Sequence, residues 1–189
     1  MWNILLDEYP QEWNGYKLNT DFRIGIMISM ASVDKELTDA EKIAVVVDLL
    51  FENDYPSEST EIAECVQWFL NDWTHDHHKK SSGVEVMSFD ADQGRIYSAF
   101  LSQYHIDLSN ESMHFWRFMN LITNLEECTF TRVIDIRGKK LDSKMSKEER
   151  KYYANAKRTY SIDNGIIDEE AKEEEREATE EFLKFIGKR

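Results

Sequence analysis

MHFWRFMNLITNL, residues 113–125, decides the fold class of this chain of 189 residues. Its apolar side chains recur at helical spacing, and they cover a wide arc of the helix rather than one narrow stripe. A helix that is apolar around most of its circumference is buried on several sides. We therefore expect a helix that begins at a Ser109 cap, runs through this stretch and forms the centre of a helical domain.

Capped helices are predicted on both sides of this stretch. Thr38 with Glu41 forms a capping box before an apolar stripe that ends at Leu50. Ser146 with Glu149 forms a second capping box, which opens a helix to about Tyr160. Further helices are expected from a Ser59 or Thr60 cap to Trp73, from about Phe89 to Tyr104, and from a Thr129 cap to Ile136.

The first segment predicts a small β-hairpin. Asn14-Gly15 stands between Trp13 and Tyr16, and both turn residues tolerate the positive φ that a two-residue hairpin needs. Thr20-Asp21 then resembles a helix start, although the short apolar run after it also fits a buried strand. The fold class predicted is mainly α, a compact multi-helix domain over residues 1–160 with an N-terminal hairpin, followed by an acidic C-terminal helical extension over 161–189.

The composition supports helices and excludes several classes. Only 2 prolines and 7 glycines occur, and their scarcity argues against a many-stranded sandwich or barrel. No apolar run is long enough to span a membrane, and the acidic start does not resemble a signal peptide. Two cysteines cannot build a disulfide framework, so a reducing cytoplasm is expected.

Charge is unevenly distributed along the chain. Lys and Arg number 23 against 37 Asp and Glu, for a net charge of −14. Residues 130–160 nevertheless hold ten Lys or Arg and four Asp or Glu. The acidic total makes general nucleic-acid binding unfavourable because phosphates are repelled. We interpret the basic segment as a solvated helix face that pairs with acidic surfaces, although its tyrosines could in principle stack on bases.

Motifs that would indicate catalysis are weak or missing. The cluster His75-Asp76-His77-His78 has ligands that suit zinc or nickel, but its spacing is not that of a helical metal pair, and a solvated loop is the simpler interpretation. No nucleophile elbow and no glycine-rich phosphate loop occurs. Cys65 lies on an apolar helix face, and Glu126-Glu127 would raise the thiol pKa of Cys128. We expect no catalytic residue, no cofactor, no metal and no enzymatic activity.

Two surfaces are candidates for protein contacts. Phe115, Trp116, Arg117 and Phe118 follow one another, so together they face every side of their helix, and one or two must point outward. Trp and Arg are frequent at binding hot spots, which makes this group a partner-binding candidate. Lys147, Arg150 and Lys151 form the second candidate, a surface for self-association with an acidic region of another copy.

Several ordered patches resemble one family. They are Asn19–Arg23 after the Asn-Gly hairpin, Phe89–Asp92, Ile96–Leu108, the aromatic segment His114–Phe118, and Phe130 with Ile136-Arg137 and the Lys- and Tyr-rich helix that ends near Tyr160. With this order and spacing, residues 1–160 resemble the bacteriophage gene-product-fifteen family of long-tailed phages and prophages. None of these patches is a catalytic signature.

The resemblance implies a tail assembly chaperone in the cytoplasm of an infected or lysogenic host. Such a protein binds the tape measure protein, keeps it soluble and promotes assembly of the tail tube around it. The resemblance also implies a homo-oligomer and, as a further partner, the major tail protein. Two other functions remain open from the sequence: a helical adaptor or prophage regulator that binds nucleic acid through residues 130–160, and a small metalloenzyme that uses the histidine loop.

Overall fold

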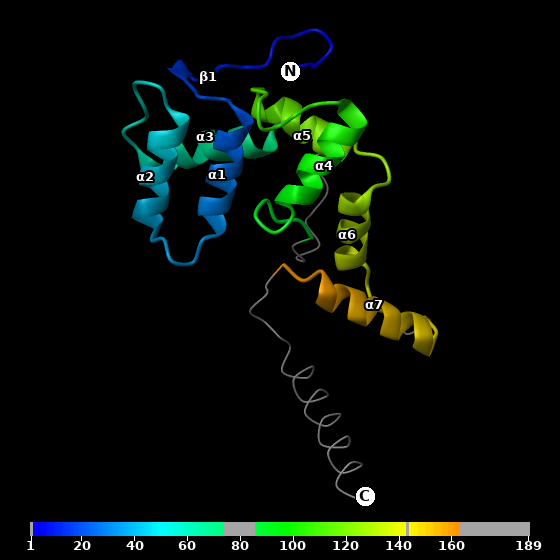
Figure 1. The fold of residues 1–189 in the computed structure, drawn as a ribbon. Helices are drawn as coiled ribbons and strands as arrows, with labels where there is room; N and C mark the ends of the chain where they lie inside the picture. The colour runs from blue at the N-terminus through cyan, green and yellow to red at the C-terminus, as the bar shows by residue number, and fades with distance from the viewer. Residues whose placement is uncertain (1, 74–85, 143, 163–189) are drawn as a thin grey trace, which may run out of the picture. The chain divides into compact units, whose positions relative to one another are not determined.

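The structure is a computed structural model that describes residues 2–73, 86–142 and 144–162. It confirms a mainly α fold with a small antiparallel N-terminal hairpin (Figure 1). The predicted acidic C-terminal helix lies outside the described residues. The elements are β1 Glu12–Trp13, β2 Tyr16–Lys17, α1 Phe22–Val33, α2 Asp39–Leu50, α3 Ser59–Asn71, α4 Gln93–Tyr104, α5 Phe115–Thr123, α6 Thr129–Gly138 and α7 Lys147–Thr159.

The chain forms two compact units, and α6 contributes residues to both. Unit 1 comprises Met1–Gly83 with Ser88–Arg132, and unit 2 comprises Val84–Met87 with Val133–Arg189. Unit 1 holds the hairpin and α1 to α5. Unit 2 holds the last part of α6 and α7. The division predicted between residues 160 and 161 stays a prediction.

The hairpin forms as the sequence predicts. Asn14 and Gly15 have φ values of 48° and 87°, so both adopt the left-handed conformation of a two-residue turn. Trp13 pairs with Tyr16 across the turn. Leu18 continues from the hairpin into an isolated bridge with Phe51, which ties the hairpin to the end of α2.

The apolar run after Thr20-Asp21 is a helix and not a strand. The Asp21 side chain accepts a hydrogen bond from the Arg23 amide at the N-terminus of α1. Helices α1 and α2 then run antiparallel side by side (Figure 1). Helix α1 also packs against α3 and α5.

Helix α5 fills the interior of unit 1 with aromatic rings. Phe118 is fully buried and stacks on Phe22 and Phe100, with ring centroids 5.0 and 5.1 Å apart. Trp116 donates its indole N–H to the Phe69 carbonyl over 2.7 Å, which joins α5 to α3. The aromatic residues of this stretch therefore form the core, as the wide apolar arc predicted.

Four predicted helix starts need correction. The helix around Phe115 begins at an N-cap of His114 and not at Ser109, because Asp107 holds Ser109 in a separate turn. Helix α3 has Glu58 at its N-cap, with no side-chain cap from Ser59 or Thr60. Helix α4 starts four residues later than predicted, at Gln93, because Phe89–Asp92 form turns. Thr129 is not a cap but the first residue of α6. The Cys128 amide donates to the Thr131 hydroxyl, not to that of Thr129.

Unit 2 is held together by a buried arginine. Arg137, near the end of α6, is 6% exposed and donates to the carbonyls of Tyr160 and Val86. Lys157 of α7 donates in return to the Arg137 carbonyl. Helix α7 begins at the predicted Ser146–Glu149 capping box, so that prediction is confirmed.

Candidate binding groove

Unit 1 carries an open groove of about 550 Å³ between α1, α4 and the segment before α5. Most of the side chains around it are apolar, and among the described residues of its lining Asp90 alone carries a charged group. The lining residues are Phe22, Ile26, Met30, Phe89, Asp90, Gln93, Gly94, Ile96, Tyr97, Leu108, Ser109 and Phe118.

The floor of the groove is rigid because it is part of the aromatic core. Phe22 and Phe118 stack with an interplanar angle of 24°, and Phe89 lies 6.2 Å from Phe118. Ile96 of α4, which also lines the groove, is 4% exposed. Side chains fixed in this way keep the groove formed in the absence of a ligand, so little conformational entropy is lost on binding.

One wall of the groove is the loop that contains Leu108 and Ser109, and Arg23 holds it in place. The Arg23 guanidinium donates to the carbonyls of Leu108 and Glu111 over 2.7 and 2.9 Å. It also pairs with Asp21 at 3.3 Å. Because a guanidinium can donate in several directions at once, this one side chain joins the loop to the start of α1.

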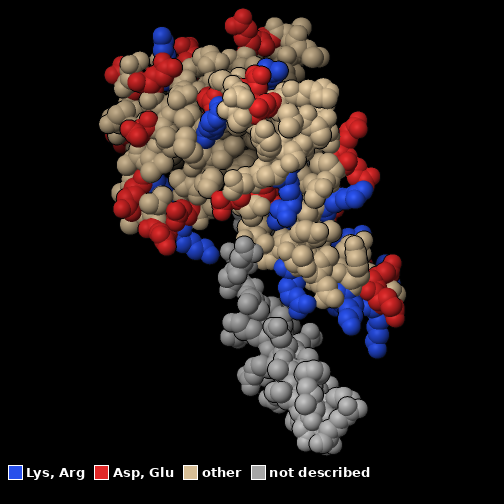
Figure 2. All heavy atoms as spheres, viewed as in Figure 1, with Lys and Arg blue, Asp and Glu red and all other residues tan. Residues whose placement is uncertain are grey.

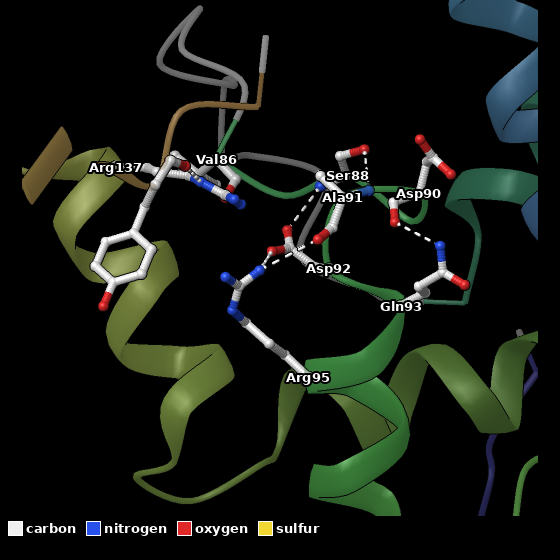
Figure 3. Close-up of polar contacts among 9 residues, drawn as sticks. Val86, Ser88, Asp90, Ala91, Asp92, Gln93, Arg95 and Arg137 are labelled. Atoms are coloured by element: carbon white, nitrogen blue, oxygen red, sulfur yellow. Dashed lines mark hydrogen bonds and ion pairs between the residues drawn. The ribbon is translucent and has the colours of Figure 1, made fainter. Parts of the chain in front are cut away.

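Another edge of the groove is the start of α4, which a buried carboxylate organises. Asp92 is fully buried, accepts from the Ser88 amide over 3.1 Å and pairs with Arg95 at 2.9 Å (Figure 3). Gln93 donates to the Asp90 carbonyl next to it (Figure 3). These contacts fix the turn that places Asp90 and Gln93 at the rim of the groove.

Two residues shape the groove entrance. Tyr97 is 38% exposed, and its hydroxyl bonds to Asp107, an interaction that raises the pKa of the tyrosine. Gly94 has no heavy atom within 4 Å of the position that a Cβ would occupy. The absence of a side chain there keeps this part of the groove empty.

This arrangement can bind apolar groups. Among the described residues that line it there is no histidine, cysteine, lysine or arginine. A preformed concave surface of phenylalanine, isoleucine, methionine and tyrosine fits the apolar face of a peptide or helix. Met30, 41% exposed at the rim, can adapt its flexible side chain to different contours.

The comparison with protein families gives the identity of the chain at the family level. The family model described as Bacteriophage Gp15 protein matches residues 5–162. The chain belongs to the bacteriophage Gp15 family. No curated protein and no solved structure matches it. The match spans both the groove of unit 1 and the described part of unit 2.

The aromatic group predicted to bind a partner is mostly internal in this Gp15 protein. Phe115, Trp116 and Phe118 are each no more than 2% exposed, whereas Arg117 is exposed. Three of the four side chains therefore stabilise the core, and Arg117 alone remains at the surface. Phe118 also lines the groove from below, and the partner-binding role of the four residues stays a prediction.

The second predicted surface is exposed. Lys147, Arg150 and Lys151 all lie on α7, a helix with no buried residue, and Figure 2 shows basic side chains gathered over this helix. The structure places the three residues on the same helix of unit 2, and none of them lines the groove. Their role in self-association stays a prediction.

The remaining sequence candidates carry no described site. His75–His78 lie outside the described residues. Cys65 is fully buried, as predicted, and burial raises its thiol pKa to about 12. Within residues 2–73, 86–142 and 144–162, no three His, Cys, Asp or Glu side chains are placed to hold a metal ion. In the same ranges no helix is long and apolar enough to cross a membrane.

Sequence reasoning missed the groove itself. Ile26, Met30, Gly94, Tyr97 and Leu108 come from three separate segments, and their sequence neighbours give no sign that they meet. One signal was present in the apolar run of α1, which is apolar on more sides than a helix with one buried face requires. Arg23 belongs to the resembling patch Asn19–Arg23, and nothing in the neighbouring sequence indicates that it positions the Leu108 loop.

Proposed function

We propose that this phage protein is a tail assembly chaperone that binds the tape measure protein through the groove of unit 1. In this proposal it acts in the host cytoplasm by binding and not by catalysis. It keeps the tape measure protein soluble and brings it to the growing tail tube, with the major tail protein as a further partner. The apolar groove is the observation that carries the proposal, and membership of the Gp15 family supports it.

The size and chemistry of the groove suit one face of an amphipathic helix. A volume of about 550 Å³ lies in the range of protein sites that enclose ligands of a few side chains. Helices bind such grooves with apolar residues spaced by three and four positions. A tape measure protein is expected to be long and helical, and its exposed apolar stripes would aggregate without cover.

The charge of the chain supports the same role. A net charge of −14 keeps complexes apart by repulsion and so favours solubility. The groove itself is nearly uncharged, with Asp90 at its rim. An apolar binding surface on an acidic protein can therefore cover apolar segments while the complex remains dispersed.

Coexpression with the tape measure protein of the same phage, expected to be a long helical protein, tests the proposal. The wild-type chain is expected to copurify with that protein and to increase its soluble fraction. Met30→Glu, which places a carboxylate in the groove, is expected to lower binding at least tenfold. Met27→Glu is the matched control, since Met27 is also on α1, is also 41% exposed and does not line the groove.

Gly94→Phe provides a second test because it fills the groove without replacing a core residue. The space around Gly94 accommodates a side chain, so the fold is expected to persist while binding is lost. Equal binding by wild type, Met30→Glu and Gly94→Phe would show that the groove is not the site. A wild-type chain that neither binds the long protein nor keeps it soluble would refute the chaperone role.

A further inference from the structure

The outer face of α7 carries a basic stripe. Lys147, Lys151 and Arg158 stand at positions i, i+4 and i+11, with Ala154 at i+7, so these four residues share one face of the helix. All four are exposed, whereas the half-buried residues of α7 lie on its other side. Among residues 2–73, 86–142 and 144–162, no side chain of this basic stripe has an ion-pair partner. The stripe is therefore a charged surface that an acidic partner can cover.

Helix α2 of unit 1 carries an acidic row with the same spacing. Glu41, Val45 and Asp48 stand at positions i, i+4 and i+7 of one helix face, and Glu52 at i+11 follows just beyond the helix end. The three carboxylates are exposed and Val45 is half-buried. The buried residues of α2 lie on the opposite side of the helix. Figure 2 shows acidic side chains gathered over this part of unit 1.

Charge distinguishes α2 as the surface that complements α7. Helix α7 has five Lys or Arg against two Glu, for a net charge of +3, whereas α2 has one Lys against three Asp or Glu, for −2. Helix α3 is also acidic, but its carboxylates, Glu61 and Glu64, stand three positions apart and no third one continues their row within the helix. Surfaces of opposite potential attract each other and select their orientation.

We propose that α7 of one copy docks antiparallel on α2 of a second copy, with the basic stripe on the acidic row. In this register every cation of the stripe meets a carboxylate of the row. The pairs are Lys151 with Asp48, Arg158 with Glu41, and Lys147 with Glu52. A parallel arrangement would instead place Lys151 opposite Val45 and Asp48 opposite Ala154, so it makes fewer charge pairs. Antiparallel helices also bring macrodipole ends of opposite sign together.

The same register gives the contact a small apolar centre. Ala154 meets Val45, and side chains of this size allow two helix axes to approach to about 8–10 Å. Arg150 flanks the stripe opposite the half-buried Leu49, where its aliphatic stem can cover the leucine while its charge remains in water. Glu41 binds Thr38 through Oε2, which leaves Oε1 to accept from Arg158.

The contact joins two different surfaces, and every copy carries both. Such a heterologous contact can repeat from one copy to the next. Exposed ion pairs contribute little individually, so the association is expected to be weak, sensitive to salt and dependent on the concentration of the chain. No residue of the stripe or of the row lines the groove of unit 1, so the inference does not rest on the function proposed for the groove.

Charge reversal in the full-length chain tests the register by analytical ultracentrifugation at low salt. The wild-type chain is expected to self-associate as its concentration rises and to dissociate in about 0.5 M NaCl. Asp48→Lys and Lys151→Glu are each expected to weaken the association roughly three- to tenfold. The two changes in one chain restore it, because the pair is then reversed and not lost. Both positions are exposed, so the helices are expected to stay folded, which circular dichroism checks.

Mixing the two single variants tests whether the partner is a second copy. An equimolar mixture of the Asp48→Lys and Lys151→Glu chains is expected to associate more tightly than either chain alone, because Lys151 of one chain meets Asp48 of the other. Glu64→Lys on α3 and Lys140→Glu in unit 2 are the matched controls. They make the same charge changes at exposed positions outside the two surfaces and leave the association unchanged. Met30→Glu, which alters the groove, also leaves it unchanged.

Three outcomes would overturn the proposal. A wild-type chain that stays monomeric at every concentration would exclude self-association. Equal weakening by Asp48→Lys and Glu64→Lys would show that net charge acts and that α2 is not the docking surface. A mixture that associates no better than the single variants would show that α7 does not bind α2 of a second copy.

Discussion

At the scale of single residues, His114 links three parts of unit 1. Its Nδ1 accepts from the Trp116 amide over 3.0 Å, and its Nε2 lies 2.9 Å from the Pro10 carbonyl. The first contact needs a lone pair and the second a proton, so the ring is neutral with its hydrogen on Nε2. Tyr9 stacks on the ring at 4.9 Å. Burial lowers the pKa of His114 below its ordinary value of 6.5.

This histidine makes the stability of the protein dependent on pH. The unfolded chain binds a proton at about pH 6.5, whereas the folded chain resists protonation. The contribution of His114 to the free energy of unfolding is therefore fully present above pH 6.5, and it is lost as the pH falls below that value. Urea unfolding between pH 5 and 7.5 measures the slope. His114→Asn can still cap α5 and is expected to reduce the slope, whereas His105→Asn at an exposed site with φ of 55° leaves it unchanged.

Gly25 is the residue that permits α1 and α5 to approach each other. A Cβ at this position would lie 2.1 Å from the Phe115 ring, so Gly25→Ala forces the helices apart or moves a buried aromatic side chain. The expected loss is about 1–3 kcal/mol of unfolding free energy, measured in urea. Gly94→Ala is the control. Its Cβ has open space, and alanine stabilises a helix by about 0.5–1 kcal/mol relative to glycine.

At the scale of elements, Arg23 connects the start of α1 to the loop that forms a groove wall. Arg23→Lys keeps the charge but cannot reach the Leu108 and Glu111 carbonyls in the same geometry. We expect a loss of about 1–2 kcal/mol and faster amide exchange at Asn110 and Glu111, measured by NMR. The groove is also expected to bind its partner less tightly.

Arg132→Lys is the control for that change. Arg132 pairs with Glu127, but both side chains are largely exposed, at 69% and 75%. An exposed ion pair contributes at most about 1 kcal/mol, so the substitution is expected to change neither stability nor amide exchange in the 108–111 loop. Equal effects of the two substitutions would show that Arg23 acts through its charge and not through its two carbonyl contacts.

Local sequence signals predicted those elements whose ends are closed by nearby residues. Thr38–Glu41 and Ser146–Glu149 each form the expected capping box, and Asn14-Gly15 forms the expected turn. The start of α5 was predicted wrongly, because its cap depends on contacts with residues distant in the sequence. Asp21 bridges His114, and the Phe115 amide donates to Thr20. The sequence around residue 114 contains no pattern that predicts contacts with Thr20 and Asp21.

At the scale of the whole molecule, the two cysteines report on the opening of unit 1. Cys65 is fully buried with a thiol pKa of about 12, whereas Cys128 is half-buried. With a disulfide reagent at pH 8, we expect Cys128 to react quickly and Cys65 to react at the rate at which the core opens. Cys128→Ser is expected to remove the fast phase. Rapid labelling of both thiols would show that the core is loosely packed.

The amino-acid sequence by itself determined the helical class, the hairpin, the two helix starts with capping boxes, the acidic character and the family. The helices and the hairpin follow from hydrophobic periodicity, capping and turn residues, which act over a few positions, and the acidic character follows from the composition. Only the tertiary structure decided that Phe115, Trp116 and Phe118 are internal and that Ile26, Tyr97 and Leu108 meet in a groove. The reason is physical: a groove exists where distant segments leave space between packed side chains, and that space depends on contacts such as those of Arg23 and Asp92.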